Sequence, residues 1–177
     1  MTSEIIIAGF GGQGIVSSGI ILAHAGLIEN KHVTFFPSYG AEMRGGTANC
    51  SVVISTETVA SPIVAIPNIV IIMNEPSLSR FEPTIKPHGL LFFNQTLIKS
   101  RPKRKDIIVV PVEANALAEE LGQGRIANMV MLGALVKKTK VLNLDSLKKA
   151  QRTRFTKASE EQLVLNDKAL EKGYGLF

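Results

Sequence analysis

Four glycines in residues 9–14, in the order Gly-Phe-Gly-Gly-Gln-Gly, form the first candidate binding site in the sequence. They follow residues 4–8, a β-branched and mostly apolar run that is typical of a buried strand in a parallel sheet. From residue 13 onward, apolar residues recur at helical spacing up to a stop near residues 29 and 30. Unpaired N–H groups at the start of a helix favour an anion, and glycines let it approach the backbone. The sequence therefore predicts a strand, a tight turn and a helix. The candidate anion-binding residues are Gly11, Gly12, Gln13 and Gly14.

The same glycines match the G-x-G-x-x-G pattern of dinucleotide-binding turns. A nicotinamide or flavin site also requires an Asp or Glu at the end of the second strand, about 20 residues later, to hold the ribose. Here the expected second strand ends in Pro37 and Ser38, and Glu29 precedes it. An anion-binding loop is therefore the favoured interpretation. A dinucleotide site and a purely structural turn are the alternatives.

A second candidate site is the loop of residues 37–46, which reads Pro-Ser-Tyr-Gly-Ala-Glu-Met-Arg-Gly-Gly. Arg44 presents a planar fork of donors that suits a carboxylate or phosphate, and the glycines after it admit a ligand or another chain. The alternative is that Arg44 pairs with Glu42 and only fixes the loop. The residues that we predict to contact a ligand or a partner chain are Ser38, Arg44, Gly45, Gly46 and Thr47.

Length and composition favour one globular domain. The chain has 177 residues, of which 45% are hydrophobic, so one domain over residues 1–177 can bury a sizeable core. No basic region precedes the first apolar run, and the most apolar stretches are too short or too interrupted to span a bilayer. We therefore expect a cytoplasmic protein that does not bind a membrane.

The cysteine and histidine content argues against a metal site in this chain. The single cysteine, Cys50, lies in residues 47–54, where alternating apolar residues share one strand face. Free cysteine usually behaves as a small buried hydrophobe, so Cys50 is expected in the core. The three histidines show no ligand spacing with one another or with Cys50. We expect no metal ligands here.

The net charge of +5 is concentrated in two segments, residues 99–105 and 148–157. A nucleic-acid-binding stripe would carry interleaved aromatic residues, and only Phe155 is present. We therefore expect no nucleic-acid partner. The segments are either a solvated surface or a region that attracts an acidic partner protein or a polyphosphate ligand.

The order of elements predicts an α/β fold, a three-layer α/β/α domain with a mostly parallel, mixed sheet. The expected strands are residues 4–8, 33–36, 47–55, 69–73, 90–94 and 107–110. The expected helices are residues 13–29, 75–81, 113–121, 125–138, 144–155 and 159–172, so the C-terminal part is helical from about residue 113. The glycine loop after the first strand is Rossmann-like. Ligands of such sheets bind at the carboxyl ends of the strands, where both loops lie, so the two loops can face one site.

Three segments together resemble a known family. Residues 9–14, residues 36–48 (Phe-Pro-Ser-Tyr-Gly-Ala-Glu-Met-Arg-Gly-Gly-Thr-Ala) and residues 128–134 (Asn-Met-Val-Met-Leu-Gly-Ala) are similar to the gamma subunit of 2-oxoacid:ferredoxin oxidoreductases. The resemblance covers most of residues 4–136, and the second segment is closest to the 2-oxoglutarate members (2-oxoglutarate synthase). Ala41 stands where the family commonly has proline.

The resemblance implies a subunit of a larger enzyme. Such enzymes decarboxylate a 2-oxoacid oxidatively on thiamine diphosphate, pass electrons through iron–sulfur clusters to ferredoxin and release an acyl-CoA. It implies that thiamine diphosphate, its Mg²⁺ and the clusters belong to alpha and beta subunits, with a ferredoxin-like delta subunit as an option, and that ferredoxin is an indirect partner. One cysteine agrees with this division, because a cluster requires four thiolates. No catalytic residue is expected in this chain.

Within that resemblance, the gamma subunit helps to bind coenzyme A and completes the assembly. The hypothesis for this chain is that residues 11–14 cradle the coenzyme A phosphates through backbone N–H groups, while Arg44, Ser38 and Thr47 orient the thiol end or a subunit contact. Pyruvate, branched-chain 2-oxoacid and indolepyruvate enzymes are alternatives for the substrate. A purely architectural subunit and a free-standing dinucleotide-dependent reductase are alternatives for the function, the latter weakened by the missing ribose carboxylate.

Overall fold

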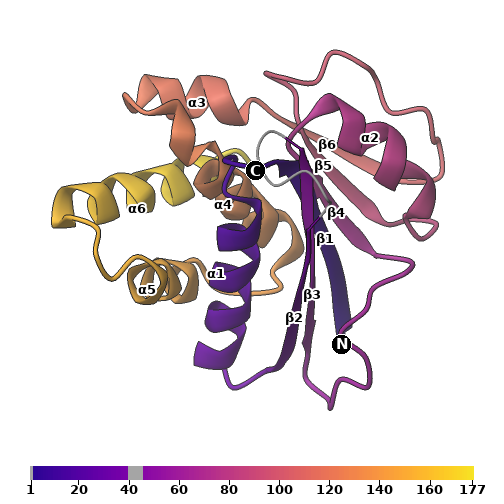
Figure 1. Ribbon diagram of the computed structural model, residues 1–177, viewed down its shortest axis with the longest axis horizontal. Helices are drawn as coiled ribbons and strands as arrows, with labels where there is room; N and C mark the ends of the chain where they lie inside the picture. Colours follow the sequence, from indigo (N-terminus) through magenta and orange to yellow (C-terminus); the bar gives the residue numbers. More distant parts are fainter. Residues whose placement is uncertain (1, 40–45) are drawn as a thin grey trace.

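The computed structural model describes residues 2–39 and 46–177, which form one six-stranded sheet with helices on both faces (Figure 1). The strands are β1 (Thr2–Phe10), β2 (His32–Tyr39), β3 (Thr47–Ser55), β4 (Ile69–Ile72), β5 (Leu90–Asn94) and β6 (Ile108–Val112). The helices are α1 (Ile15–Ile28), α2 (Glu75–Phe81), α3 (Ala114–Glu120), α4 (Ala127–Thr139), α5 (Leu144–Arg154) and α6 (Glu160–Tyr174), with short 3-10 turns η1 (Glu82–Thr84) and η2 (Gly124–Ile126). The α/β fold class expected from the sequence is confirmed.

The sheet is mixed, in the order β2-β3-β1-β4-β5-β6. Strands β1, β4, β5 and β6 are parallel neighbours, whereas β3 runs antiparallel to both β1 and β2. The connection between β2 and β3 is short, and a short connection can join only antiparallel strands. Strand β3 pairs with both β1 and β2 and so lies between them. The carboxyl ends of β1 and β2 still lie at the same edge, with β3 separating them.

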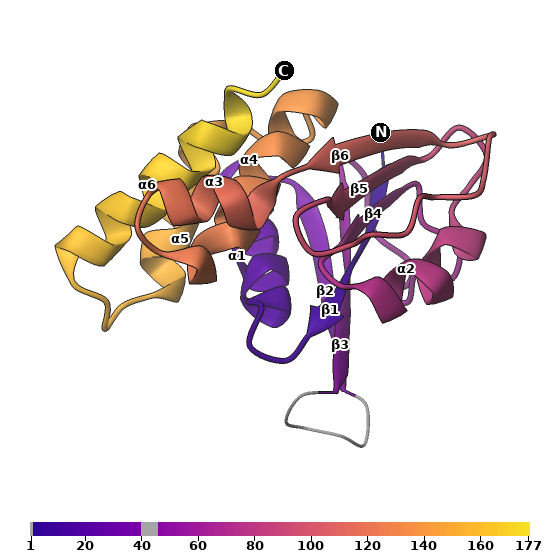
Figure 2. The ribbon, with the colours of Figure 1, turned by 90° about the horizontal axis from the view of Figure 1, so that it is seen from above.

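The helices are distributed unequally over the two faces of the sheet. Figure 1 shows α2 on one face and α1 with α4 on the other, and Figure 2 shows α5 and α6 packed outside α1 and α4. The expected three layers therefore carry a fourth, helical layer. Helix α4 lies between the sheet and α6, and every residue from 127 to 136 is buried. This explains why its sequence is apolar almost all round.

No helix in the described part of the chain has both the length and the apolar character needed to cross a membrane.

Cys50 lies in the core, as the sequence predicts. Its side chain is fully buried in β3, and its Sγ lies 3.5 Å from the carbonyl oxygen of Ile15. Burial raises the pKa of the Cys50 thiol to about 12. At pH 8, less than about 0.1% of such a thiol is ionised, and only the thiolate reacts readily.

We therefore expect the folded chain to resist alkylation by iodoacetamide at pH 8, while the chain in guanidinium chloride is labelled once. Intact-mass spectrometry measures both. Rapid stoichiometric labelling of the folded chain, at the rate of the denatured chain, would contradict the buried position.

Candidate functional site

The glycine turn after β1 needs glycine at two positions. The φ angles of Gly12 and Gly14 are 95° and 74°, in the left-handed region that side chains with a Cβ rarely adopt. A Cβ on Gly14 would also lie 2.5 Å from Nδ2 of Asn128, which comes from the start of α4. The turn therefore requires glycine for its backbone conformation and, at Gly14, also for space.

Gln13 fixes this turn from inside. Its Oε1 accepts a 2.7 Å hydrogen bond from the N–H of Phe10, and its Nε2 donates to the carbonyl oxygen of Met73 at 3.0 Å. The backbone N–H of Gln13 donates to the carbonyl of Phe10, and that of Gly11 donates to the carbonyl of Gly46, each at 3.1 Å. Two of the four predicted backbone donors are thus engaged within the chain in this conformation.

The remaining donors lie at the start of α1. No side chain caps the first turn of α1, and this turn has no acidic residue. Within residues 2–39 and 46–177, no hydrogen bond engages the N–H of Gly12 or Gly14. The carbonyl oxygen of Gly14 instead accepts from Oγ of Ser18 at 2.9 Å and from Nδ2 of the buried Asn128 at 3.4 Å. The carbonyl oxygen of Gly14 therefore has hydrogen-bond donors within the chain, whereas the N–H groups of Gly12 and Gly14 could donate to an anion.

Two hollows, of about 180 and about 240 Å³, flank the tip of the turn. Both are lined by Gly12 and Arg125, the latter from η2. Arg125 is exposed, and no carboxylate in the described part of the chain pairs with it. Arg154 adds a second cation, since its Nη2 lies 3.4 Å from Oγ of Ser17 in the first turn of α1. The helix start and two arginines therefore give this region a positive potential.

Arg125 and Arg154 were not predicted as site residues. They are separated from the glycine turn by more than a hundred residues, and neither belongs to a motif that marks an anion site. Only the packing of α4 and α5 against α1 brings them to the turn. Asn128 belongs to one of the three segments that carry the family resemblance, and its hydrogen bonds to the start of α1 give it a structural role.

Only some residues of the second predicted loop lie next to the glycine turn. Gly46 accepts the hydrogen bond from Gly11, and Thr47 is the register partner of Phe10 on the neighbouring strand. Ser38 pairs with Asn49, one strand further away. Alternation along β3 places Ser38 and Thr47 on the face of the sheet that carries α2, opposite the face covered by α1. Arg44 and Gly45 lie outside the residues that the structure describes.

No group of three or more His, Cys, Asp and Glu side chains that could hold a metal ion occurs in residues 2–39 and 46–177.

The mixed sheet, the glycine turn with its unengaged N–H groups and the outer helical layer define an α/β domain whose hollows lie at the carboxyl edge of its sheet. Comparison with known families identifies the domain further. The family model described as pyruvate ferredoxin/flavodoxin oxidoreductase matches residues 4–176. The chain belongs to this family, and the resemblance found in the sequence is confirmed.

Relatives differ in length and in substrate. The chain is 38% identical over 171 residues to ketoisovalerate oxidoreductase subunit VorA of Methanothermobacter marburgensis, covering 96% of this chain and 35% of that protein. It is 34% identical over 177 residues to 2-oxoglutarate synthase subunit KorC of Methanocaldococcus jannaschii, covering 98% of this chain and 93% of that protein. The chain thus spans about a third of the VorA protein and nearly all of the KorC protein.

Two solved structures share the fold of this chain and have similar sequence identity to it. A 2-oxoglutarate:ferredoxin oxidoreductase from Magnetococcus marinus, solved with 2-oxoglutarate, coenzyme A and succinyl-CoA bound, matches 99% of this chain and 31% of its own, with a TM-score of 0.90 and 28% identity. The gamma subunit of a keto/oxoacid ferredoxin oxidoreductase from Geobacter sulfurreducens matches 98% of this chain and 96% of its own, with a TM-score of 0.83 and 26% identity.

Proposed function

We propose that the chain is the gamma-type part of a multi-subunit, cytoplasmic 2-oxoacid:ferredoxin oxidoreductase, folded as one domain. The favoured reaction converts 2-oxoglutarate, coenzyme A and oxidised ferredoxin to succinyl-CoA, CO₂ and reduced ferredoxin. Family membership over residues 4–176 is the observation that carries the proposal. The segment of residues 36–48 favours 2-oxoglutarate, whereas the VorA relative keeps a branched-chain 2-oxoacid as the second candidate.

Partner chains supply the redox chemistry in this proposal. Thiamine diphosphate with Mg²⁺ and the iron–sulfur clusters would belong to alpha and beta subunits, as the family resemblance implies. The single cysteine of this chain agrees with that division for the clusters, because a cluster requires four thiolates. A ferredoxin-like delta subunit is an optional further partner. This chain then contributes to coenzyme A binding and to assembly, and no catalytic group.

The glycine turn is suited to the phosphates of coenzyme A. Gly12 and Arg125 line both hollows at the tip of the turn, next to the start of α1, and no hydrogen bond within residues 2–39 and 46–177 engages the N–H of Gly12 or Gly14. A diphosphate at the tip of the turn would receive backbone hydrogen bonds and a cation together. The loop with Arg44, next to Thr47, then orients the thiol end or contacts a partner subunit. The Magnetococcus marinus relative was solved with coenzyme A bound, which supports a coenzyme A site in the assembled enzyme.

Arg44→Ala tests the second loop in the assembled enzyme. We expect the apparent KM for coenzyme A to rise about tenfold, because a charge-assisted contact is lost, while the KM for the 2-oxoacid stays unchanged. Anaerobic purification with the partner chains, followed by assays with several 2-oxoacids, provides both the enzyme and its substrate preference. An unchanged KM for coenzyme A in a fully assembled Arg44→Ala enzyme would exclude this role.

Gly12→Val distinguishes a glycine turn that binds coenzyme A from one that only packs against a partner chain. If the turn binds coenzyme A, the variant assembles and its affinity for coenzyme A falls. If the turn only packs against a partner chain, the variant elutes free of its partners in size-exclusion chromatography. Arg44→Ala then leaves coenzyme A kinetics unchanged as well.

A further inference from the structure

The connection between β5 and β6 leaves part of the sheet uncovered. Parallel neighbours are usually joined by a helix that covers the sheet, but residues 95–107 form no helix. They cross the α2 face and bury Ile98 and Ile107 in its core. Next to this loop, Val109 and Pro111 of the edge strand β6 remain exposed on the same face.

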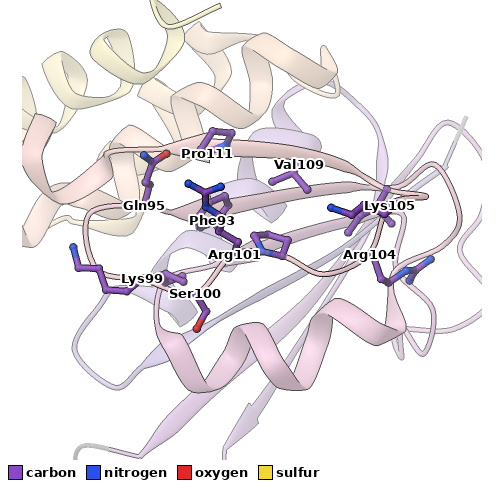
Figure 3. A pocket seen from close by; sticks show the side chains of 12 residues that line it. Phe93, Gln95, Lys99, Ser100, Arg101, Arg104, Lys105, Val109 and Pro111 are labelled. Atoms are coloured by element: carbon purple, nitrogen blue, oxygen red, sulfur yellow. The ribbon is translucent and has the colours of Figure 1, made fainter.

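A groove of about 770 Å³ opens between the loop and β6 (Figure 3). Phe93, Val109 and Pro111 form an apolar floor, and the loop of residues 98–105 forms a wall that is rich in cations. The groove is separate from the glycine turn, with which it shares no lining residue.

The wall is held by hydrogen bonds from beneath. Oε1 of Glu82, which is only 7% exposed, accepts the backbone N–H groups of Lys103 at 2.5 Å and Arg104 at 2.7 Å. The Arg104 guanidinium pairs with Asp106 and also donates to the carbonyl oxygen of Ile85. Arg104 therefore stabilises the wall itself, and its charge is already paired with that of Asp106.

Besides Arg104, three cations line the groove itself, and none has an acidic partner within the described residues. Lys99, Arg101 and Lys105 are exposed, and none forms an ion pair with a carboxylate of residues 2–39 or 46–177. Figure 3 shows them spread along the groove, with Lys99 and Lys105 toward opposite ends and Arg101 between them. A single phosphate group would need donors that converge on one point. A row of separate cations above an apolar floor suits a longer occupant that carries both apolar and acidic side chains.

The edge of β6 limits how such an occupant docks. Pro111 has no N–H group, so an added strand would lose a hydrogen bond there, and proline at an edge strand opposes sheet extension. The occupant is therefore expected on the face of the sheet.

We propose that this groove binds an acidic segment of a partner protein, whose apolar side chains pack on Val109 and Pro111 and whose carboxylates pair with Lys99, Arg101 and Lys105. The pairing is partly exposed, so it is expected to weaken as salt rises.

The test uses the full chain and a displayed library of random peptides of about 12 residues. Selected peptides are expected to be enriched in Asp and Glu beside apolar residues. Synthetic copies should bind the chain in fluorescence anisotropy at least about tenfold more weakly after the triple change Lys99→Glu, Arg101→Glu and Lys105→Glu. The matched control reverses the charge of three exposed lysines of α5, α6 and the loop between them, and should leave binding unchanged: Lys149→Glu, Lys157→Glu and Lys168→Glu.

Circular dichroism and thermal unfolding establish that both triple variants are folded. Selected peptides without acidic enrichment, or equal binding by the groove variant and the control variant, would overturn the proposal. It would also be overturned if the groove variant loses calorimetric binding of ATP or coenzyme A while peptide binding is unchanged. That result would assign the groove to a small phosphorylated ligand.

Discussion

Gly133→Ala is expected to destabilise the folded chain by about 3 kcal/mol, because it forces apart two helices that touch through their backbones. A Cβ on Gly133 in α4 would lie 2.0 Å from the carbonyl oxygen of Leu170 in α6. The contact is reciprocal, since a Cβ on Gly173 would lie 1.8 Å from the carbonyl oxygen of Val130. Backbone atoms cannot rotate away as a side chain can, so the helices must separate. The gain in helix propensity from Ala, about 1 kcal/mol, offsets only part of this cost.

Thermal and urea unfolding measure the effect, and a loss of about 3 kcal/mol corresponds to roughly 6–12 °C in Tm for a domain of this size. Gly175→Ala is the matched control at the end of α6. Its φ of −73° suits alanine, and its added Cβ would meet no atom closer than 3.5 Å. We expect that control within about 0.5 kcal/mol of the wild-type chain. If Gly133→Ala unfolds at the same temperature as Gly175→Ala, the close approach of α4 and α6 is wrong.

The elements of this fold could be predicted because each has a local signal. Residues 4–8 and 69–73 are mostly apolar and rich in β-branched side chains, and residues 125–138 are apolar almost all round, so a strand or a buried helix could be predicted for each from its pattern. The close contact of α4 and α6 has no such signal. Gly133 and Gly173 lie in different helices, and a single glycine in a helical pattern does not show which backbone it approaches.

The site shows the same division between local and distant information. The turn at Gly12 and Gly14 could be predicted from the glycine spacing. The hydrogen bond from Gln13 to the carbonyl oxygen of Met73 could not, because Met73 follows β4, which is distant in the sequence. The sequence also does not show that β3 separates β1 from β2, and this order places Ser38 away from the glycine turn. Arg125 reaches the turn only through tertiary packing. Cations that tertiary packing brings to a turn from distant segments follow no spacing rule that a sequence could reveal.

Arg125→Gln is expected to weaken coenzyme A binding by about ten- to a hundredfold, since a charge-assisted phosphate contact contributes about 1.5–3 kcal/mol. The variant keeps a side chain of similar length and loses only the charge, and Arg125 is exposed and makes no ion pair within the described residues, so the fold should be unaffected. Isothermal titration calorimetry of the assembled enzyme with coenzyme A, at low and at moderate salt, measures the change. The loss should shrink at higher salt, because salt screens the missing charge in the wild-type protein as well.

Arg101→Gln provides the control that locates the ligand. It removes the same charge from the groove beside β6, which shares no lining residue with the glycine turn. If coenzyme A binds at the turn, Arg101→Gln leaves its dissociation constant within about twofold, and Arg125→Lys, which keeps a point charge without the planar fork, lies between wild type and Arg125→Gln. If Arg101→Gln weakens coenzyme A and Arg125→Gln does not, the phosphates bind beside β6. The open donors of Gly12 and Gly14 would then serve a contact with a partner chain.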